Sequence, residues 1–492
     1  MYVDEILQAA KIGKWNITIV VVILTAQAII GSTFAFYQIM FGKMNFECKE
    51  GRTNMNECFD IYNNSSSACT SFTFYPGKEF DDTLRSKFQL VCDREHLAEI
   101  DVNALFIGQM LGSFFGALII DYFGRKFALV TGCIVNLLCS LTYLWSPNFY
   151  ILMIGRCIES FFNVVVFIAG LIYLSEAIPS KYAIYGTSSA EAIFGLGTFL
   201  SAVVSIVVRR WNVYLIIRLI MPYSLIILSL IFIDESPKWL LEKRRIQDFN
   251  RVVHKVFRLN KTELTPTIES YLDKMDLDEH KAEVSLKFWQ LFQTKSTAFR
   301  MIALSMCWLS AANIYYALIF GPELFHLDVH TYLMISGLSE LPATIVHMMS
   351  ANKIGRKSTQ IVFSFLSVAF LILGTLLSEN LIIIKLIAVC FNKLTATVIF
   401  LNVHVWNAEL MPTPLRAVGM GIASFMGRLI SVALPQLIND ISIYIAYFPI
   451  MFFLSLGIIA IVFALHLPET KNEIFPETIK DYENFGRKCT PH

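Results

Sequence analysis

Ten ionisable residues lie inside long apolar stretches of this chain, where charge is unusual. A charged side chain at membrane depth costs several kcal/mol, so such groups usually face a cavity or a partner of opposite charge. We therefore regard them as the residues best placed to bind or pair with an ion. They are Arg156, Glu159, Glu191, Arg218, Glu340, His347, Lys385, Lys393, His404 and Arg428.

Arg428 is the strongest candidate for ion binding, because it falls in the middle of an apolar run, seven residues before Pro435 (435 − 428). A guanidinium in a low-dielectric cavity can hold a carboxylate by two parallel hydrogen bonds and would repel an organic cation. The alternative is a structural arginine paired with an acid such as Glu340. Arg156 and Glu159 are one helical turn apart, so we interpret them as a pair that neutralises itself.

Two polar islands repeat in the same order, half a chain apart. Asp121-Tyr-Phe-Gly124-Arg125-Lys126 precedes Glu176-Ala-Ile-Pro179, and Asn352-Lys-Ile-Gly355-Arg356-Lys357 precedes Glu409-Leu-Met-Pro412. The shifts are 231 (355 − 124) and 233 (409 − 176) residues. Glycine permits a tight turn, and the acids can pair with the arginines. Such direct repetition is one way in which transporters build alternating access.

The elements that must position these residues are membrane helices. The chain has 492 residues, of which 55% are hydrophobic and 16% charged, whereas soluble proteins average about 25% charged residues. A net charge of +1 gives no field to attract nucleic acid. Twelve apolar runs are each near the roughly 20 residues that span a bilayer: 16–41, 101–121, 127–145, 148–174, 187–208, 212–233, 299–320, 331–351, 359–377, 381–404, 417–439 and 443–466.

The distribution of basic residues predicts the orientation. Lysine and arginine gather beside the two islands, in the middle segment and at both chain ends, and among the short loops of the opposite side only Arg209 and Arg210 are basic. We expect the following order: a cytoplasmic N-terminus (1–15), a six-helix bundle (16–233) with an extracellular loop (42–97), a cytoplasmic linker with short helices (234–298), a second six-helix bundle (299–466) and a cytoplasmic tail (467–492).

The loop 42–97 carries features of an oxidising compartment. Its four cysteines predict two disulfides, with three possible pairings, and Asn63-Asn64-Ser65-Ser66 holds two overlapping glycosylation acceptors. The four are Cys48, Cys58, Cys69 and Cys92. No metal-ligand spacing, phosphate-binding loop or hydrolytic constellation is evident, so we expect no cofactor, no direct use of ATP and no enzyme activity.

Several motifs resemble one family, the organic cation, organic anion and carnitine transporters of the major facilitator superfamily. They are Gln89-Leu-Val-Cys-Asp93, Asp234-Glu-Ser-Pro-Lys-Trp-Leu240, Glu409-Leu-Met-Pro-Thr413 with Arg416, Leu467-Pro-Glu-Thr-Lys471 and Phe475-Pro-Glu-Thr-Ile479. The resemblance covers residues 88–483 and implies an all-α major facilitator fold of twelve transmembrane helices in two halves. The chain departs from the family at Lys181 and Ala183, at Asn352, at Asn472, and in having four loop cysteines where many members have six.

The resemblance also implies roles for individual residues. Arg428 matches the position that tends to be arginine in anion and carnitine carriers and aspartate in cation carriers. Lys393, 16 residues before Glu409, matches a lysine of the tenth helix, and Phe400, Tyr315, Tyr316 and Phe194 match or resemble aromatic positions along the substrate path. Glu340 could pair with Arg428, bind an onium group or carry a proton. The gating residues would be Asp121, Gly124, Arg125, Lys126, Glu176, Gly355, Arg356, Lys357, Glu409 and Arg416.

The sequence thus predicts a polyspecific plasma-membrane carrier of small organic anions or zwitterions that works as a monomer by rocker-switch alternating access. Its partners would be a small organic ion, the bilayer and a possible coupling ion or exchanged counter-substrate. The alternatives are an organic cation carrier that uses Glu340 or Glu191 as counter-charge, and a non-transporting membrane sensor with a carrier fold.

Overall fold

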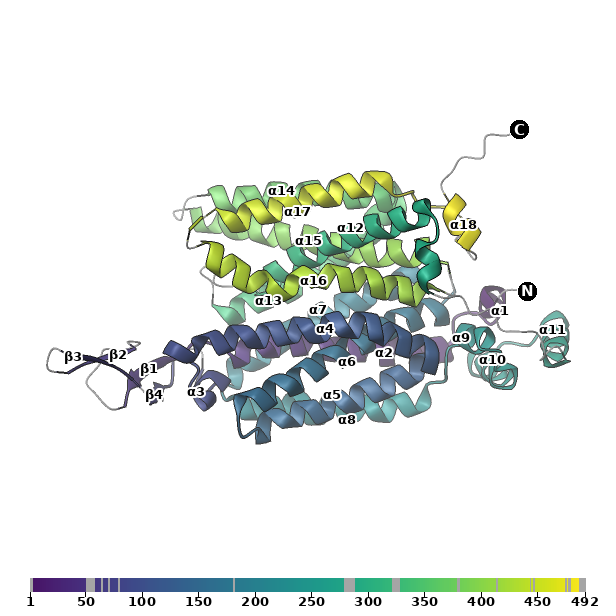
Figure 1. Cartoon of the computed structure of the whole chain (residues 1–492). Coiled ribbons are helices and arrows are strands. Elements are labelled where there is room, and N and C mark those ends of the chain that lie inside the picture. The colour runs from purple at the N-terminus through teal and green to yellow at the C-terminus, as the bar shows by residue number, and fades with distance from the viewer. Residues whose placement is uncertain are drawn as a thin grey trace.

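The computed structural model describes all residues except 1–2, 50–57, 63–64, 70, 78–79, 180–181, 278–287, 321–327, 378–380, 413–414, 443, 446, 474–475, 477–478 and 486–492. The predicted glycosylation acceptors Asn63 and Asn64 therefore lie outside the described residues. Long helices form two packed bundles, one above the other in Figure 1, and both chain ends lie at the same end of the molecule. We call this the termini end and the opposite one the loop end.

Among the described residues, each bundle contains six long helices. The long helices of the first bundle are α2 (Lys14–Met40), α4 (Glu95–Phe123), α5 (Arg125–Trp145), α6 (Phe149–Ala177), α7 (Ala183–Val207) and α8 (Trp211–Phe232), and a short helix α1 (Val3–Ala9) precedes them. The second bundle comprises α12 (Lys295–Phe320), α13 (Val329–Ile354), α14 (Arg356–Leu376), α15 (Ile382–Leu410), α16 (Arg416–Ser442) and α17 (Phe448–His466).

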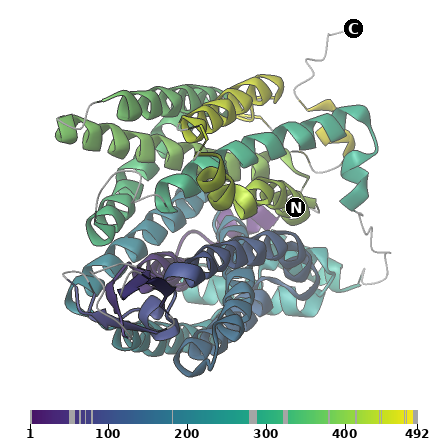
Figure 2. The same ribbon diagram turned by 60° about the vertical axis from the view of Figure 1, so that its left-hand side comes forward.

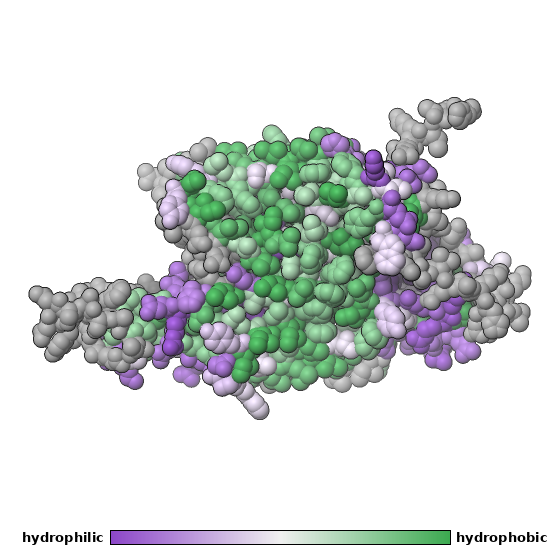
Figure 3. Space-filling view, viewed as in Figure 1, coloured by the Kyte–Doolittle hydropathy of each residue, from purple (hydrophilic) through white to green (hydrophobic). Residues whose placement is uncertain are grey.

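These helices agree with the predicted apolar runs to within a few residues. Nine helices among the described residues are long and apolar enough to cross a membrane, and α8, α13 and α16 complete the two bundles. On the face shown in Figure 3, hydrophobic side chains form a broad band across the middle of the molecule, with hydrophilic surface toward both ends. Such a band is what a bilayer requires of the surface it contacts.

The loop end carries four short strands that the apolar pattern did not indicate. β1 (Asn45–Cys48) pairs antiparallel with β4 (Phe72–Tyr75), and β2 (Phe59–Tyr62) pairs antiparallel with β3 (Ser65–Ala68). α3 (Leu84–Phe88) and a 3₁₀ turn, η1 (Cys92–Arg94), return the chain to α4. Disulfides join Cys48 to Cys69 and Cys58 to Cys92, which selects one of the three possible pairings.

Short helices gather at the termini end. They are α9 (Pro237–Glu242), α10 (Ile246–Asn260), α11 (Pro266–Leu277), the 3₁₀ turn η3 (Phe288–Phe292) and α18 (Ile479–Asn484). The buried face of α10, which includes Phe249, Val253 and Phe257, packs into the main hydrophobic core. Asn260 at its end accepts a hydrogen bond from the Trp15 backbone (3.1 Å) and so fastens the linker to the start of α2.

The two bundles meet along two helix pairs, α4 with α16 and α7 with α13. Figure 2, turned by 60°, shows the two bundles again as separate layers. Close backbone approach is possible because glycine occupies the crossing points. A Cβ on Gly337 of α13 would lie 2.6 Å from the Gly195 carbonyl oxygen of α7, and one on Gly421 of α16 would lie 2.7 Å from the Ser113 carbonyl oxygen of α4.

Candidate functional site

A small cavity lies between the bundles, with a volume of about 30 Å³. A more open hollow, beside Lys87 and Trp211 at the loop end, is remote from the intramembrane charges. The central cavity has an aromatic wall and few polar groups, as ligand sites commonly do. Its lining consists of Ile30, Phe34, Gln109, Asn163, Val164, Phe167, Glu191, Phe194, Tyr315, Tyr316, Phe400 and Arg428.

Arg428 on α16 is buried in this wall, with 3% of the residue exposed. Its guanidinium donates to Gln109 Oε1 (3.3 Å), to the Tyr316 hydroxyl (3.0 Å) and to the Ser424 carbonyl oxygen (3.3 Å) and hydroxyl. Each of these acceptors is neutral. Within the described part of the chain, no carboxylate lies within ion-pair distance of Arg428, although Glu191 in the same cavity interacts with it electrostatically.

Glu340 on α13 pairs with Lys393 and not with Arg428. Lys393 Nζ lies 2.9 Å from Glu340 Oε1, and the Tyr315 hydroxyl donates to the same oxygen (2.9 Å). The Lys393 ammonium also sits 3.6 Å from the centre of the Tyr315 ring, whose plane is stacked on Phe400 at 4.5 Å. The second predicted cation is therefore neutralised, and its contacts hold Tyr315 and Phe400 in place.

Aromatic rings close the cavity across the two bundles. Tyr316 of α12 stacks on Phe34 of α2 (6.3 Å between ring centres) and meets Phe106 of α4 edge to face (5.3 Å). Phe194 of α7 lies against Phe34 (5.4 Å). The sequence-predicted residues Arg428, Tyr315, Tyr316, Phe400 and Phe194 thus share one cavity, with Glu340 and Lys393 behind Tyr315.

Glu191 on α7 also lines the cavity, although the sequence assigned it no definite role. The residue is 3% exposed, and its Oε1 oxygen has no hydrogen-bond partner. Buried polar atoms without a protein partner are uncommon, and this oxygen can accept a hydrogen bond or contact a cation. The cavity therefore holds a carboxylate as well as a guanidinium.

The expected Arg156–Glu159 pair is wrong. Arg156 pairs with Asp101 of α4, whereas Glu159 pairs with Arg218 of α8 at 3.0 Å. Glu159 also accepts hydrogen bonds from Ser140 (2.9 Å) and Tyr143 (2.8 Å) of α5. Spacing along one helix predicted a pair, but in a bundle each charge points to a different neighbouring helix. The charges stay balanced and tie α4, α5 and α8 to α6.

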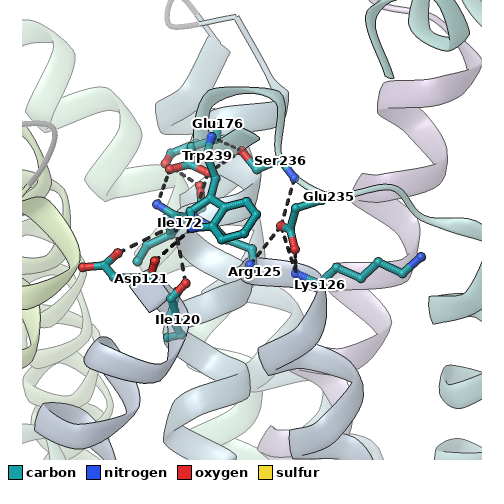
Figure 4. A network of polar contacts seen from close by, with 10 residues as sticks. Ile120, Asp121, Arg125, Lys126, Ile172, Glu176, Glu235, Ser236 and Trp239 are labelled. Atoms are coloured by element: carbon teal, nitrogen blue, oxygen red, sulfur yellow. Dashed lines mark hydrogen bonds and ion pairs between the residues drawn. The ribbon is translucent and has the colours of Figure 1, made fainter. Parts of the chain in front are cut away.

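The first polar island forms a buried network at the termini end (Figure 4). Arg125 donates twice to Glu176, at 3.0 and 2.8 Å, and lies 3.7 Å from Asp121. The Ser236 hydroxyl donates to Glu176 (2.5 Å). Two parallel hydrogen bonds between guanidinium and carboxylate fix geometry as well as charge. The island therefore joins α4, α5 and α6 to the segment after α8.

Glu235 caps the start of α5. Its carboxylate accepts from the Arg125 backbone N–H (2.9 Å) and the Lys126 backbone N–H (3.1 Å). Burial raises the pKa of Glu235, and hydrogen bonds from backbone N–H groups oppose that rise. Gly124 has φ +100°, and a Cβ there would lie 2.3 Å from the capping carboxylate. The glycine is thus required both by its conformation and by the space that Glu235 occupies.

The second island repeats this arrangement. Arg356 pairs with Glu409 (2.7 Å), and Thr470 donates to Glu409 (2.5 Å). Glu469 caps α14 by accepting from the Arg356 (2.8 Å) and Lys357 (3.1 Å) backbones, beside Gly355 at φ +91°. Glu235 and Glu469 are 234 residues apart (469 − 235). The Glu-Ser and Glu-Thr pairs that follow α8 and α17 thus form a third repeated element.

Arg416 lies between the two networks. Its buried guanidinium interacts electrostatically with Glu176 of the first bundle and with Glu409 of the second. From the sequence, Arg416 was expected to lie beside the second island alone.

The two predicted gating lysines contribute differently to these networks. Lys126 donates to Glu235 through its backbone N–H. Lys357 donates to Glu469 through its backbone N–H and also donates through Nζ to the Leu465 carbonyl oxygen (2.6 Å).

Sequence reasoning missed Gln109, Phe34, Phe106 and the capping role of Glu235 and Glu469. An uncharged glutamine and two phenylalanines in apolar runs carry no distinctive signal. The capping acids could have been found from the repeat, because an acid followed by serine or threonine occurs at equivalent places after the sixth and last apolar runs.

Comparisons with known proteins agree with this architecture. A model of the family described as sugar (and other) transporter matches residues 21–482. An organic cation transporter-like protein of Drosophila melanogaster is 25% identical over 86% of this chain and 76% of its own length. The human organic cation/carnitine transporter 2 is 25% identical over 81% of this chain and 71% of its own length.

Among solved structures, the proton:xylose symporter XylE bound to 6-bromo-6-deoxy-D-glucose superposes with a TM-score of 0.71. It covers 95% of this chain and 98% of its own, at 16% sequence identity, which shows a shared fold.

Proposed function

Because this chain belongs to the sugar (and other) transporter family of the major facilitator superfamily, we propose that it is a carrier of small organic anions or zwitterions. Its resemblance to organic cation, organic anion and carnitine transporters is confirmed by its relatives. The observation that carries the proposal is the Arg428 guanidinium, which is buried in the central cavity without a carboxylate partner among the described residues.

The physical reason is that a buried guanidinium with no directly bonded carboxylate favours a ligand with negative charge. Bringing a carboxylate to Arg428 adds charge-assisted hydrogen bonds in a site from which water is excluded. An organic cation at the same place would meet like charge. Tyr315, Tyr316, Phe400 and Phe194 would contact the organic part of the substrate, and Lys393 with Glu340 would hold Tyr315 in position.

Transport would follow from rocking of residues 1–233 against 299–466 around the cavity. We infer that the island networks, with Arg416 between them, are the gates of the cytoplasmic side. We also propose a plasma-membrane location, cytoplasmic termini and linker (234–298), glycosylation at Asn63 or Asn64, and function as a monomer. A coupling ion or exchanged counter-substrate is compatible with this scheme.

An organic cation carrier is the second candidate, and Glu191 is the observation that favours it. Its carboxylate lines the cavity with one unpartnered oxygen, beside aromatic rings that can hold an onium group. The printed names of the relatives include cation carriers. A zwitterion could use Arg428 and Glu191 together.

The test is uptake into proteoliposomes of radiolabelled benzoate, glycine betaine and tetraethylammonium, at two pH values. We expect benzoate or betaine uptake, and we expect Arg428→Asp to lower it about 10- to 100-fold, because charged hydrogen bonds are lost. Arg258→Asp, at an exposed arginine of α10, is the matched control. Unchanged anion uptake by Arg428→Asp contradicts the proposal. Binding without uptake of any solute would instead support a sensor.

A further inference from the structure

One hydrogen bond joins the two bundles through the candidate substrate arginine. Gln109 lies on α4 of the first bundle and accepts from Arg428 Nε on α16 of the second (3.3 Å). Both side chains line the central cavity, and both residues are at most 3% exposed. We propose that, when no substrate is bound, Gln109 accepts the hydrogen bond that Arg428 would otherwise donate to the substrate's anionic group. The carrier can then reorient without substrate, and net transport is possible.

The inference rests on the proposed function in one respect, that Arg428 meets the anionic part of the substrate. A carrier that is limited to exchange returns only when loaded, whereas a carrier capable of net transport must also return empty. The return of the carrier without substrate passes through a state that is closed at both ends, and this structure is closed at both ends. On the loop-end side the bundles are in contact at Ser205 and His330 (2.8 Å). On the termini side they are in contact at Ser188 and His347 (3.3 Å).

In that closed state the charge of Arg428 has to be satisfied without substrate. A buried charge lacking polar partners is strongly disfavoured. Tyr316 and Ser424 belong to the same bundle as Arg428 and stay beside it in every state. Among the described hydrogen-bond partners of Arg428, Gln109 alone comes from the other bundle, so its bond forms when the bundles close and breaks when they part.

Lys393 provides the contrast within the same molecule. Its partner Glu340 lies in the same bundle, so the ion pair stays formed when the bundles move. Lys393 therefore needs no new partner in the closed state. Of these two cations of the second bundle, Arg428 is the one whose described hydrogen-bond partners change as the bundles close. An amide oxygen suits this task, because it accepts a hydrogen bond from the guanidinium yet, being neutral, yields to a carboxylate.

Gln109→Leu tests the inference by separating two modes of transport in one preparation. Influx of radiolabelled benzoate is measured into empty vesicles and into vesicles preloaded with unlabelled benzoate, with the membrane potential clamped at zero. We expect wild-type protein to show both fluxes. Gln109→Leu should lower influx into empty vesicles about tenfold or more, the effect of one charged hydrogen bond, and change exchange by less than about twofold.

Two further variants keep the test decisive. Gln27→Leu removes another buried amide, one that donates within the first bundle to the Phe167 carbonyl oxygen (3.3 Å), and should leave the ratio of the two fluxes unchanged. Gln109→Glu keeps an acceptor, so it should preserve the ratio while raising the benzoate KM, because its carboxylate competes for Arg428.

The remaining outcomes overturn the inference in distinguishable ways. Equal loss of both fluxes, or no loss, in Gln109→Leu shows that Gln109 has no special part in the empty return. Rapid exchange by wild-type protein without influx into empty vesicles rejects net transport and leaves the proposed function standing. Absence of either benzoate flux in wild-type protein rejects the anion proposal and this inference with it.

Discussion

The Lys393–Glu340 pair illustrates what single residues contribute in this molecule. Both side chains are almost fully buried, and the pair is bonded further to Tyr315. Buried ion pairs add little net stability over apolar residues of similar volume, but loss of one partner strands the other charge. The pair is therefore a constraint on geometry, holding Tyr315 and Phe400 at the cavity.

This view predicts non-additive effects of substitution. Lys393→Met or Glu340→Leu alone should each destabilise the protein by about 3–5 kcal/mol, because an unpaired charge remains buried. The double variant should recover most of that loss. Thermal unfolding of the purified variants in one detergent measures this, and equal, additive losses in the double variant would exclude an interacting pair.

At this scale the sequence predicted residue types better than residue partners. Arg428, Tyr315, Tyr316, Phe400 and Phe194 were chosen from charge and resemblance, and all line one cavity. Partners depend on how helices rotate against one another, which the sequence of a single helix does not encode. Arg156 therefore pairs with Asp101, and Glu159 pairs with Arg218, instead of with each other. For the same reason the sequence did not predict that Gln109 contacts Arg428.

Among the elements, the starts of α5 and α14 deserve comparison because an acid from a distant segment caps each. Glu235 and Glu469 satisfy backbone N–H groups that a helix leaves free at its first turn, and the positive end of the helix dipole favours their charge. The Tyr173 hydroxyl donates to the Asp234 carbonyl oxygen, and Trp406 Nε1 donates to the Pro468 carbonyl oxygen, so both capping segments are anchored alike.

We predict that Glu235→Ala and Glu469→Ala each lower stability by about 0.5–2 kcal/mol, the usual cost of losing a helix cap. Glu473→Ala, an exposed acid that follows the second cap, is the control and should change little. Unfolding temperatures in detergent provide the measurement. An effect of Glu473→Ala as large as that of Glu469→Ala would argue against specific capping.

The helices themselves were the most predictable elements, because each is a long apolar run bounded by Gly, Pro or charged residues. The strands β1–β4 were not predicted, because four-residue pairs held beside disulfides carry no long periodic signal. The cysteine pairing likewise required the fold, since spacing alone permits three arrangements.

For the whole molecule, contacts between the bundles at both ends define a closed conformation. Ser205 and His330 bring α7 and α13 together on the loop-end side, and Phe114 and Phe425 meet between α4 and α16 (6.0 Å between ring centres). A carrier that rocks must break the contacts of one end at a time.

Cross-linking across the loop-end contact should therefore stop transport. In a Ser205→Cys/His330→Cys variant, oxidation should lower benzoate uptake about tenfold or more, and reduction should restore it, with wild-type protein given the same treatments. Ser367→Cys/Asn392→Cys links two helices of one bundle (2.8 Å between the native side chains) and should keep its uptake when oxidised. Uptake that persists through a quantitative Ser205–His330 cross-link would exclude rocking at this contact.

The capping acids have a consequence for how the protein is made. Glu235 is synthesised before any of the second bundle, so the first network can close while the ribosome is still translating. Glu469 follows α17, the last long helix of the second bundle. The second network must therefore wait until the whole second bundle has been synthesised, and a stop codon just after α17 would yield every long helix but leave the start of α14 without its cap.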